Sequence, residues 1–209
     1  MKRILFYFFL LALLPGNTAL AITTAEKEFS SNNRTKFSTA GHPKSKGINM
    51  VLSYPNGWLA KEGERPNIVQ KFVSAGGREL EMALIMIRPL PLPAGTVISE
   101  KELNDFFTPI EMKDLIPPRA TFIHAKTTRI EGLPAGILEY SMRSERAGVA
   151  MDFQFISYIF IYGNNMVQLQ CAVGNGQLTT PALLARKMDK FKPLFLLMAN
   201  SIVLLDKWK

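Results

Sequence analysis

The sequence is poor in the residues that build disulfide frameworks, metal sites and acid–base catalytic groups. Its 209 residues include one cysteine, two histidines and two tryptophans. The single cysteine, Cys171, excludes an intramolecular disulfide, whereas small secreted eukaryotic domains usually depend on several. It lies in an alternating strand pattern, 166–173, which favours a buried apolar residue over a reactive thiol. With no short-spaced ligand motif in the chain, we expect no metal site and no cofactor.

Long apolar runs are equally scarce, and the only one lies near the start of the chain. Residues 4–14 are apolar, follow a charged start and lead through Pro-Gly to an Ala-Leu-Ala ending. This pattern is typical of a secretory signal peptide, because a membrane-spanning helix needs about 20 apolar residues. We therefore expect residues 1–21 to be a signal peptide, cleaved between Ala21 and Ile22. No cysteine follows the run, so the pattern indicates a bacterial protein of the periplasm or exterior that is not a lipoprotein.

Beyond this leader, the composition divides the chain into two parts. Residues 22–46 are rich in Ser, Thr, Asn and Lys and lack an apolar period, which is typical of a flexible tether. From 47 to 209, alternating apolar patterns predict strands, and helical spacing interrupts them only after Ser99 and after Thr180. Many strands with few helices predict an α+β fold, an antiparallel sheet sandwiched by helices (α/β/α) in a single domain.

The expected strands differ in whether one or both of their faces must be buried. They span 48–53, 67–74, 79–87, 120–130, 135–143, 149–162, 166–173 and 201–205. In 79–87 both faces become apolar, so this strand should lie centrally in a sheet that is covered on both sides. Met82 and Met86 share one of its faces, and we expect the methionines of the domain to fill the core rather than bind copper. Trp58 is likewise expected in the core, and Pro193 is expected to kink or restart the last helix.

Three motifs resemble those of a known superfamily. They are Tyr-Pro-Asn-Gly-Trp at 54–58 in a first hairpin, Ile-Glu-Gly-Leu-Pro-Ala at 130–135, and a last helix that leads into Asn-Ser-Ile at 200–202. In this order they are similar to the PsbP-like superfamily, which includes the photosystem protein PsbP, a yeast Ran-binding import factor and bacterial DcrB-type periplasmic proteins. The resemblance covers roughly 47–205. It implies an α/β/α sandwich used mainly to bind other proteins, and it implies no catalytic residue.

The formal charge of +8 first suggests a polyanion as the partner. The excess, however, lies in the leader, in 22–46 and beyond residue 185, while 47–185 is close to neutral. A nucleic-acid-binding domain places its basic stripe on the folded face that meets phosphate. We therefore expect no nucleic acid, and at most a weak contact of the basic ends with a membrane surface.

The candidate site is the mixed-charge loop Lys-Glu-Gly-Glu-Arg-Pro at 61–66. A soluble connector is one interpretation of this loop. The other is a recognition loop, because binding residues concentrate on loops that a rigid scaffold holds. On that interpretation, the partner-binding residues are Glu62, Glu64 and Arg65.

Three functions remain open from the sequence alone. The first is an exported, non-enzymatic binding protein of the bacterial envelope, with another protein as its partner. The second is an immunity or chaperone-like protein that binds a toxin or an exported effector. The third is a hydrolase with an unrecognised site around His124. The sequence leaves the partner's identity and the oligomeric state undetermined.

Overall fold

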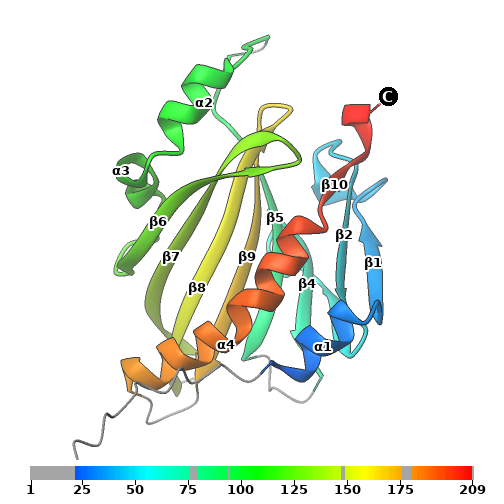
Figure 1. Ribbon diagram of the computed structural model, residues 1–209. Coiled ribbons are helices and arrows are strands. Elements are labelled where there is room, and N and C mark those ends of the chain that lie inside the picture. Colours follow the sequence, from blue (N-terminus) through cyan, green and yellow to red (C-terminus); the bar gives the residue numbers. More distant parts are fainter. Residues whose placement is uncertain (1–21, 76–79, 94, 147–148, 176–179, 209) are drawn as a thin grey trace, which may run out of the picture.

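The structure is a computed structural model that describes residues 22–75, 80–93, 95–146, 149–175 and 180–208 (Figure 1). The predicted signal peptide, 1–21, lies outside these residues, and its cleavage stays a prediction. Among the described residues, no helix combines the length and the apolar character that crossing a bilayer requires.

Two antiparallel sheets form the framework. The larger has seven strands in the order β3-β4-β5-β9-β8-β7-β6, and the smaller has the order β1-β2-β10. The strands of the large sheet are β3 (Trp58–Glu62), β4 (Ile68–Ser74), β5 (Glu81–Pro89), β6 (Thr121–Ile130), β7 (Leu133–Arg146), β8 (Val149–Tyr162) and β9 (Asn165–Asn175). Those of the small sheet are β1 (Arg34–Ser38), β2 (Met50–Pro55) and β10 (Val203–Leu204).

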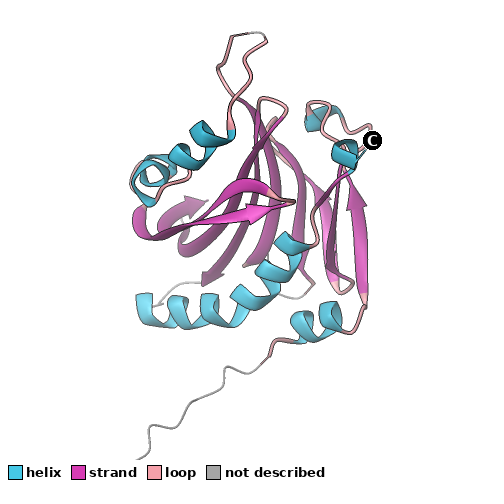
Figure 2. Ribbon diagram, turned by 45° about the horizontal axis from the view of Figure 1, so that its top comes forward, coloured by secondary structure: helices cyan, strands magenta, loops and turns pink. Residues whose placement is uncertain are grey.

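Helices lie on both faces of the large sheet, so the predicted α+β fold is confirmed. They are α1 (Thr24–Ser30), α2 (Glu100–Phe106), α3 (Pro109–Met112) and α4 (Pro181–Asn200), with short 3-10 turns at Pro43–Ser45, Lys113–Leu115 and Leu205–Trp208. The long α4 crosses one face near α1, whereas α2 and α3 lie beside the β6–β7 end (Figures 1 and 2). Two apolar clusters result. One joins α1 and α4 to the sheets, and the other joins α2 and α3 to the opposite face.

The long helix α4 begins where the sequence predicts it. Thr180 is the N-cap, its hydroxyl accepts from the amide of Leu183, and Pro181 occupies the first turn. The helix continues through Pro193 to Asn200 as one element, so the expected restart does not occur. Trp58 is in the core as predicted, 5% exposed, with its ring centroid 6.5 Å from that of Phe195.

Two tight turns join long neighbouring strands, one between β6 and β7 and the other between β8 and β9. Glu131 and Gly132 have φ of 51° and 74°, and Gly163 and Asn164 have φ of 54° and 56°, as the tight turns between long antiparallel strands require. The turn at 56–57 differs, because neither residue has a positive φ. It joins β2 to β3, which belong to different sheets. The 54–58 motif is therefore a corner between sheets and not a hairpin.

The expectation of a flexible tether over 22–46 is wrong. This segment contains α1, β1 and the turn Pro43–Ser45, and β1 pairs with β2 along its length. Phe29 is 1% exposed in the main core, and the ring of Phe37 packs edge-on against Phe72 at 5.6 Å. The polar composition concealed this, because two aromatic rings bury enough apolar surface to order a short segment.

The strand predictions fail mainly at charged or short elements. Residues 61–62 were expected in a loop, but they close β3 at the sheet edge, where solvent accommodates Lys61 and Glu62. The predicted final strand, 201–205, is reduced to the two residues of β10. By contrast, β5 lies between β4 and β9, inside the sheet as its apolar pattern predicts.

Candidate functional site

A groove of about 450 Å³ lies on the face of the large sheet opposite α4. It extends across β4, β5, β9, β8 and β7 and reaches the loop that follows β3. Helices α2 and α3 pack on the same face, but against β6 and β7 at the far end (Figure 2). Within the described residues no helix packs over the groove, which leaves the apolar side chains of these strands open to a ligand.

Four half-buried methionines form much of the groove floor. Met82 and Met86 come from β5, Met142 from β7 and Met151 from β8. Strand alternation places them on one face, since Ala83, Ile85 and Ile87 between and beside them on β5 point into the α4 core. The methionines were expected to fill the core. Met188 and Met198 do so, but these four do not.

Aromatic rings give the groove a rigid part. Phe155 stacks on Tyr140 with centroids 4.9 Å apart, and Phe153 lies 6.0 Å from Phe155. Gly174 makes room for this arrangement, because a Cβ there would lie 2.5 Å from the Phe153 ring. The phenol of Tyr140 accepts a 2.6 Å hydrogen bond from the amide of Gln170, and burial raises its pKa to about 12. The groove therefore joins fixed rings to flexible thioethers.

Charged residues of both signs form the rim. Glu64 and Arg65 line one side, and Lys71 of β4 reaches Glu64 at 3.7 Å. Glu145 of β7 lies on the other side. An apolar floor below a rim of mixed charge fits a ligand that has apolar side chains and polar flanks.

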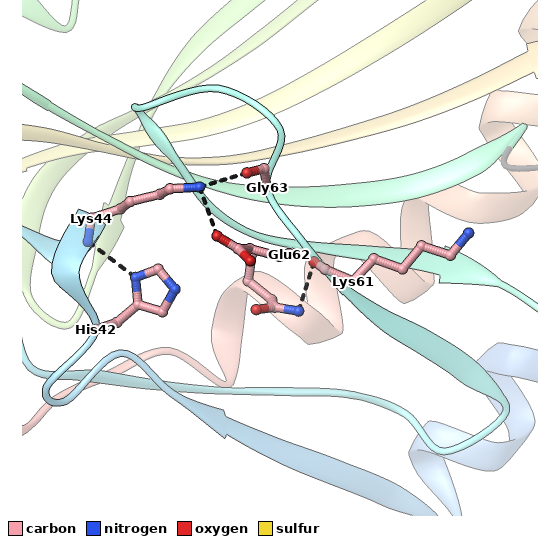
Figure 3. Close-up of polar contacts among 6 residues, drawn as sticks. His42, Lys44, Lys61, Glu62 and Gly63 are labelled. Carbon is pink, nitrogen blue, oxygen red and sulfur yellow. Dashed lines mark hydrogen bonds and ion pairs between the residues drawn. The ribbon is translucent and has the colours of Figure 1, made fainter.

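The turn before this rim is held by Lys44. Its ammonium donates a 2.6 Å hydrogen bond to the carbonyl of Gly63 and lies 3.1 Å from the carboxylate of Glu62 (Figure 3). The amide of Lys44 in turn donates to Nδ1 of His42 at 3.1 Å. Thus the segment expected to be a free tether supplies the support of the candidate loop.

The three predicted site residues therefore separate into two groups. Glu64 and Arg65 line the groove, whereas Glu62 does not line it and points toward Lys44 (Figure 3). Their role in binding a partner stays a prediction. The methionine floor was missed, although β5 carried a signal for it. Both faces of β5 are apolar, and this pattern predicted that both faces are covered. In the described chain, a helix covers only one of them.

The other chemistry-bearing residues do not gather into a site. Cys171 is 0% exposed, and burial raises the pKa of its thiol, which keeps it protonated. His124 is exposed on β6, and its side chain forms no hydrogen bond or ion pair within the described residues. The same part of the chain holds no group of three or more His, Cys, Asp or Glu placed to bind a metal.

No protein-family model and no curated protein matches the sequence. Among solved structures, PsbP of the cyanobacterium Synechocystis sp. PCC 6803 is 13% identical, with a TM-score of 0.44 over 82% of this chain and 92% of that one. LpqN of Mycobacterium tuberculosis, described as involved in cell envelope biogenesis, is 13% identical, with a TM-score of 0.45 over 87% and 96%.

The Ran-binding protein Mog1p of Saccharomyces cerevisiae is 10% identical, with a TM-score of 0.46 over 84% of this chain and 97% of that one. At these identities each likeness concerns the fold and no activity or partner. PsbP and a yeast Ran-binding protein are also the examples to which the sequence motifs led.

Proposed function

We propose that this chain is an exported, non-enzymatic binding protein of the bacterial envelope that holds an amphipathic segment of a partner protein in the methionine-lined groove. The groove floor carries the proposal, because Met82, Met86, Met142 and Met151 are only partly buried on an otherwise well-packed sheet. Thioether side chains adapt to different apolar shapes, and an open apolar surface of this kind marks an interaction site.

The rim favours a protein segment over a lipid. Arg65 and Lys71 stand beside Glu64, with Glu145 across the groove, so the rim offers both signs of charge. A peptide that carries apolar anchors between acidic and basic residues complements such a rim. An anionic headgroup would instead favour a rim of basic residues only. The signal peptide expected from 1–21 supports export of the chain.

Site-specific photocrosslinking in the native host tests this proposal. The photoreactive residue p-benzoylphenylalanine replaces Leu84 on the groove floor in one strain and Val203 of β10 in the other. We expect a discrete protein adduct from position 84 in the envelope fraction and none from position 203. Lipid adducts at 84, or the same adducts from both positions, would contradict the proposal.

The adduct must then be shown to need the groove. The crosslinked protein is purified and titrated against the wild-type chain and two lysine variants, with folding checked by thermal melting. We expect Met86→Lys to weaken binding about tenfold or more, since it places a charge on the apolar floor. Ile110→Lys changes an exposed side chain of α3 outside the groove and should leave the affinity unchanged.

A chaperone-like role is the second candidate, and the methionines favour it specifically. Flexible thioethers allow one groove to accept unrelated apolar segments. Such a role predicts several adducts from position 84, all lost in Met86→Lys, whereas a dedicated binding or immunity protein yields one. N-terminal sequencing of the exported chain tests the compartment, with Ile22 expected as the first residue.

A further inference from the structure

A second cavity of about 650 Å³ lies on the other face of the large sheet, where α4 begins. We call it the α4 pocket and define it by six of its lining residues, Arg119, Thr121, Arg143, Gln154, Thr180 and Leu184. It adjoins the groove only through Met142 and Phe153, which belong to both linings. It plays no part in the function proposed above.

The pocket exists because α4 covers only part of this face. The helix packs on β8 and β9, with Leu184 4% exposed and Met188 0% exposed against the strands. Strands β6 and β7 extend past its first turn, so Thr121 and Arg143 remain uncovered there. The result is a recess with the helix start as one wall and two strand ends as the other.

Gln154 of β8, a largely buried side chain, lines the pocket. Gln154 of β8 is 5% exposed and alternates with Ile156 and Tyr158, which places it on the α4 face. Its side chain makes no hydrogen bond within the described part of the chain, while its atoms line the cavity. Since none of the described side-chain N and O atoms is both sealed from solvent and unbonded, the amide of Gln154 is open to the cavity, where a ligand or water completes its hydrogen bonding.

The electrostatics of the pocket favour an anion. Arg119 and Arg143 face a single carboxylate, that of Asp152, which lies 3.9 Å from Nε of Arg143. The 20-residue helix α4 directs its N-terminus at the recess, and its first turn holds no acidic residue. The positive end of its dipole is therefore not offset within the helix.

The remaining lining is apolar. Leu184 is buried at the base, Ile123 is 45% exposed at the β6 rim, and Pro181 begins the helix between them. A ligand that fills this space combines an anionic end for the guanidinium groups, an amide for Gln154 and a branched apolar side chain. This is the chemistry of an acylated amino acid, whether free or as the last residue of a peptide.

We propose that the α4 pocket binds a small carboxylate that also carries an amide and an apolar side chain. The carboxylate lies at the arginine rim, the amide pairs with Gln154, and the side chain rests on Leu184 and Ile123. A hydrogen bond to the Gln154 amide inside the pocket favours ligands that carry the matching group over ligands that lack it.

Calorimetric titration of the purified exported chain with N-acetyl-leucine tests the proposal. The matched probe is N-acetyl-leucinamide, which differs only in the charged end. We expect the acid to bind about tenfold or more tightly than the amide, because a charge-assisted hydrogen bond to a guanidinium is lost in the latter. Equal binding of the two, or no binding of the acid, would overturn the proposal.

Variants then place the ligand in the pocket. Gln154→Leu is expected to weaken binding of N-acetyl-leucine about tenfold while leaving the thermal midpoint nearly unchanged, because the amide that it removes makes no hydrogen bond within the described part of the chain. Arg143→Gln, at a 73% exposed side chain, should weaken binding without disturbing the fold. Arg129→Gln, at the opposite end of β6, is the control that should bind normally.

The affinities of the two variants decide whether the ligand binds in the α4 pocket. Wild-type affinity in both Gln154→Leu and Arg143→Gln overturns the assignment, and if Gln154→Leu does not fold, Arg143→Gln decides alone. A tetrapeptide that ends in leucine distinguishes the two ligand sources. If the peptide binds more tightly than N-acetyl-leucine, the ligand of the pocket is the C-terminal residue of a peptide. If the peptide does not bind, the ligand is a free acylated amino acid.

Discussion

The ammonium of Lys192 on α4 lies 2.9 Å from the carboxylate of Glu139 on β7. The Glu139 side chain is 9% exposed and that of Lys192 is 35% exposed, so the pair stands at the edge of the core below the helix. Burial acts to lower the pKa of Lys192, but the hydrogen bonds and charges of Glu139 and Asp189 outweigh it and raise that pKa. The pair therefore fixes the position of α4 across the sheet in its charged form.

Replacing Lys192 alone should lower the free energy of unfolding more than replacing both Lys192 and Glu139. Lys192→Met leaves Glu139 charged and poorly solvated, and we expect a loss of about 2 kcal/mol in the free energy of unfolding, measured by urea denaturation at pH 7. The double variant Lys192→Met, Glu139→Leu should recover most of that loss. Equal losses in the single and double variants would show that the pair contributes little.

The raised pKa of Tyr140 predicts a loss of stability at alkaline pH. Its phenol ionises near pH 10 in the unfolded chain but, through burial, only near pH 12 in the folded one. Its contribution, about 2–3 kcal/mol, is thus fully present below pH 10 and is lost as the pH rises through 12. Tyr140→Phe should flatten the fall in unfolding free energy between pH 10 and 12. At pH 7 it should cost about 1 kcal/mol, because Gln170 loses its acceptor. An unchanged alkaline slope would contradict this assignment.

The turn behind the groove rim depends on a glycine. A Cβ on Gly63 would lie 2.1 Å from the carbonyl oxygen of Ile68, so the backbone of this turn must shift to accept one. We expect Gly63→Ala to cost about 2–3 kcal/mol in thermal or chemical unfolding. Gly57→Ala is the matched control, because its Cβ would meet only the mobile end of the Glu28 side chain, at 3.0 Å. A loss below about 1 kcal/mol is expected there.

The N-terminal segment should prove essential to stability. Phe29 of α1 is 1% exposed, and its truncation leaves a large cavity below α4. Phe29→Ala should lower the free energy of unfolding by about 3–4 kcal/mol, and deletion of 22–46 should prevent cooperative unfolding. Ile22→Ala, at a 56% exposed position, should be neutral. A stable, cooperative deletion variant would restore the tether interpretation.

The parts of this structure that were predictable from the sequence are those set by local periodicity and capping. The turn at Glu131–Gly132, the start of α4 at Thr180 and the interior place of β5 follow from short-range patterns. The ordering of 22–46 did not, because it depends on where two isolated rings meet the distant core. The sequence also did not indicate which face of β5 lacks a helix, because both faces have the same apolar pattern.

The same distinction between local and long-range signals applies to the residues of the candidate site. Charged residues beside a glycine indicate an exposed loop, and Glu64 and Arg65 of this loop line the groove, while their role in binding stays a prediction. Glu62 does not line the groove, and it pairs with Lys44 from a segment that composition alone separates from this loop. The place of Gln154 in the lining of the α4 pocket has no signature in the sequence. A glutamine in an alternating strand is more often exposed than buried, and the burial of Gln154 depends on where α4 begins.

The small sheet has a consequence for the order of folding. β2 is flanked on one side by β1 and on the other by β10, and Asn49 beside β2 bonds to Asp206 across 157 residues of sequence. The last edge of this sheet therefore closes only after the C-terminal strand has been made and α4 has docked. Such distant pairing slows folding, so the nascent chain stays open for longer than its hairpins alone would dictate. Slow closure of this sheet suits the export that we propose for the chain, because a narrow export channel admits only an unfolded form.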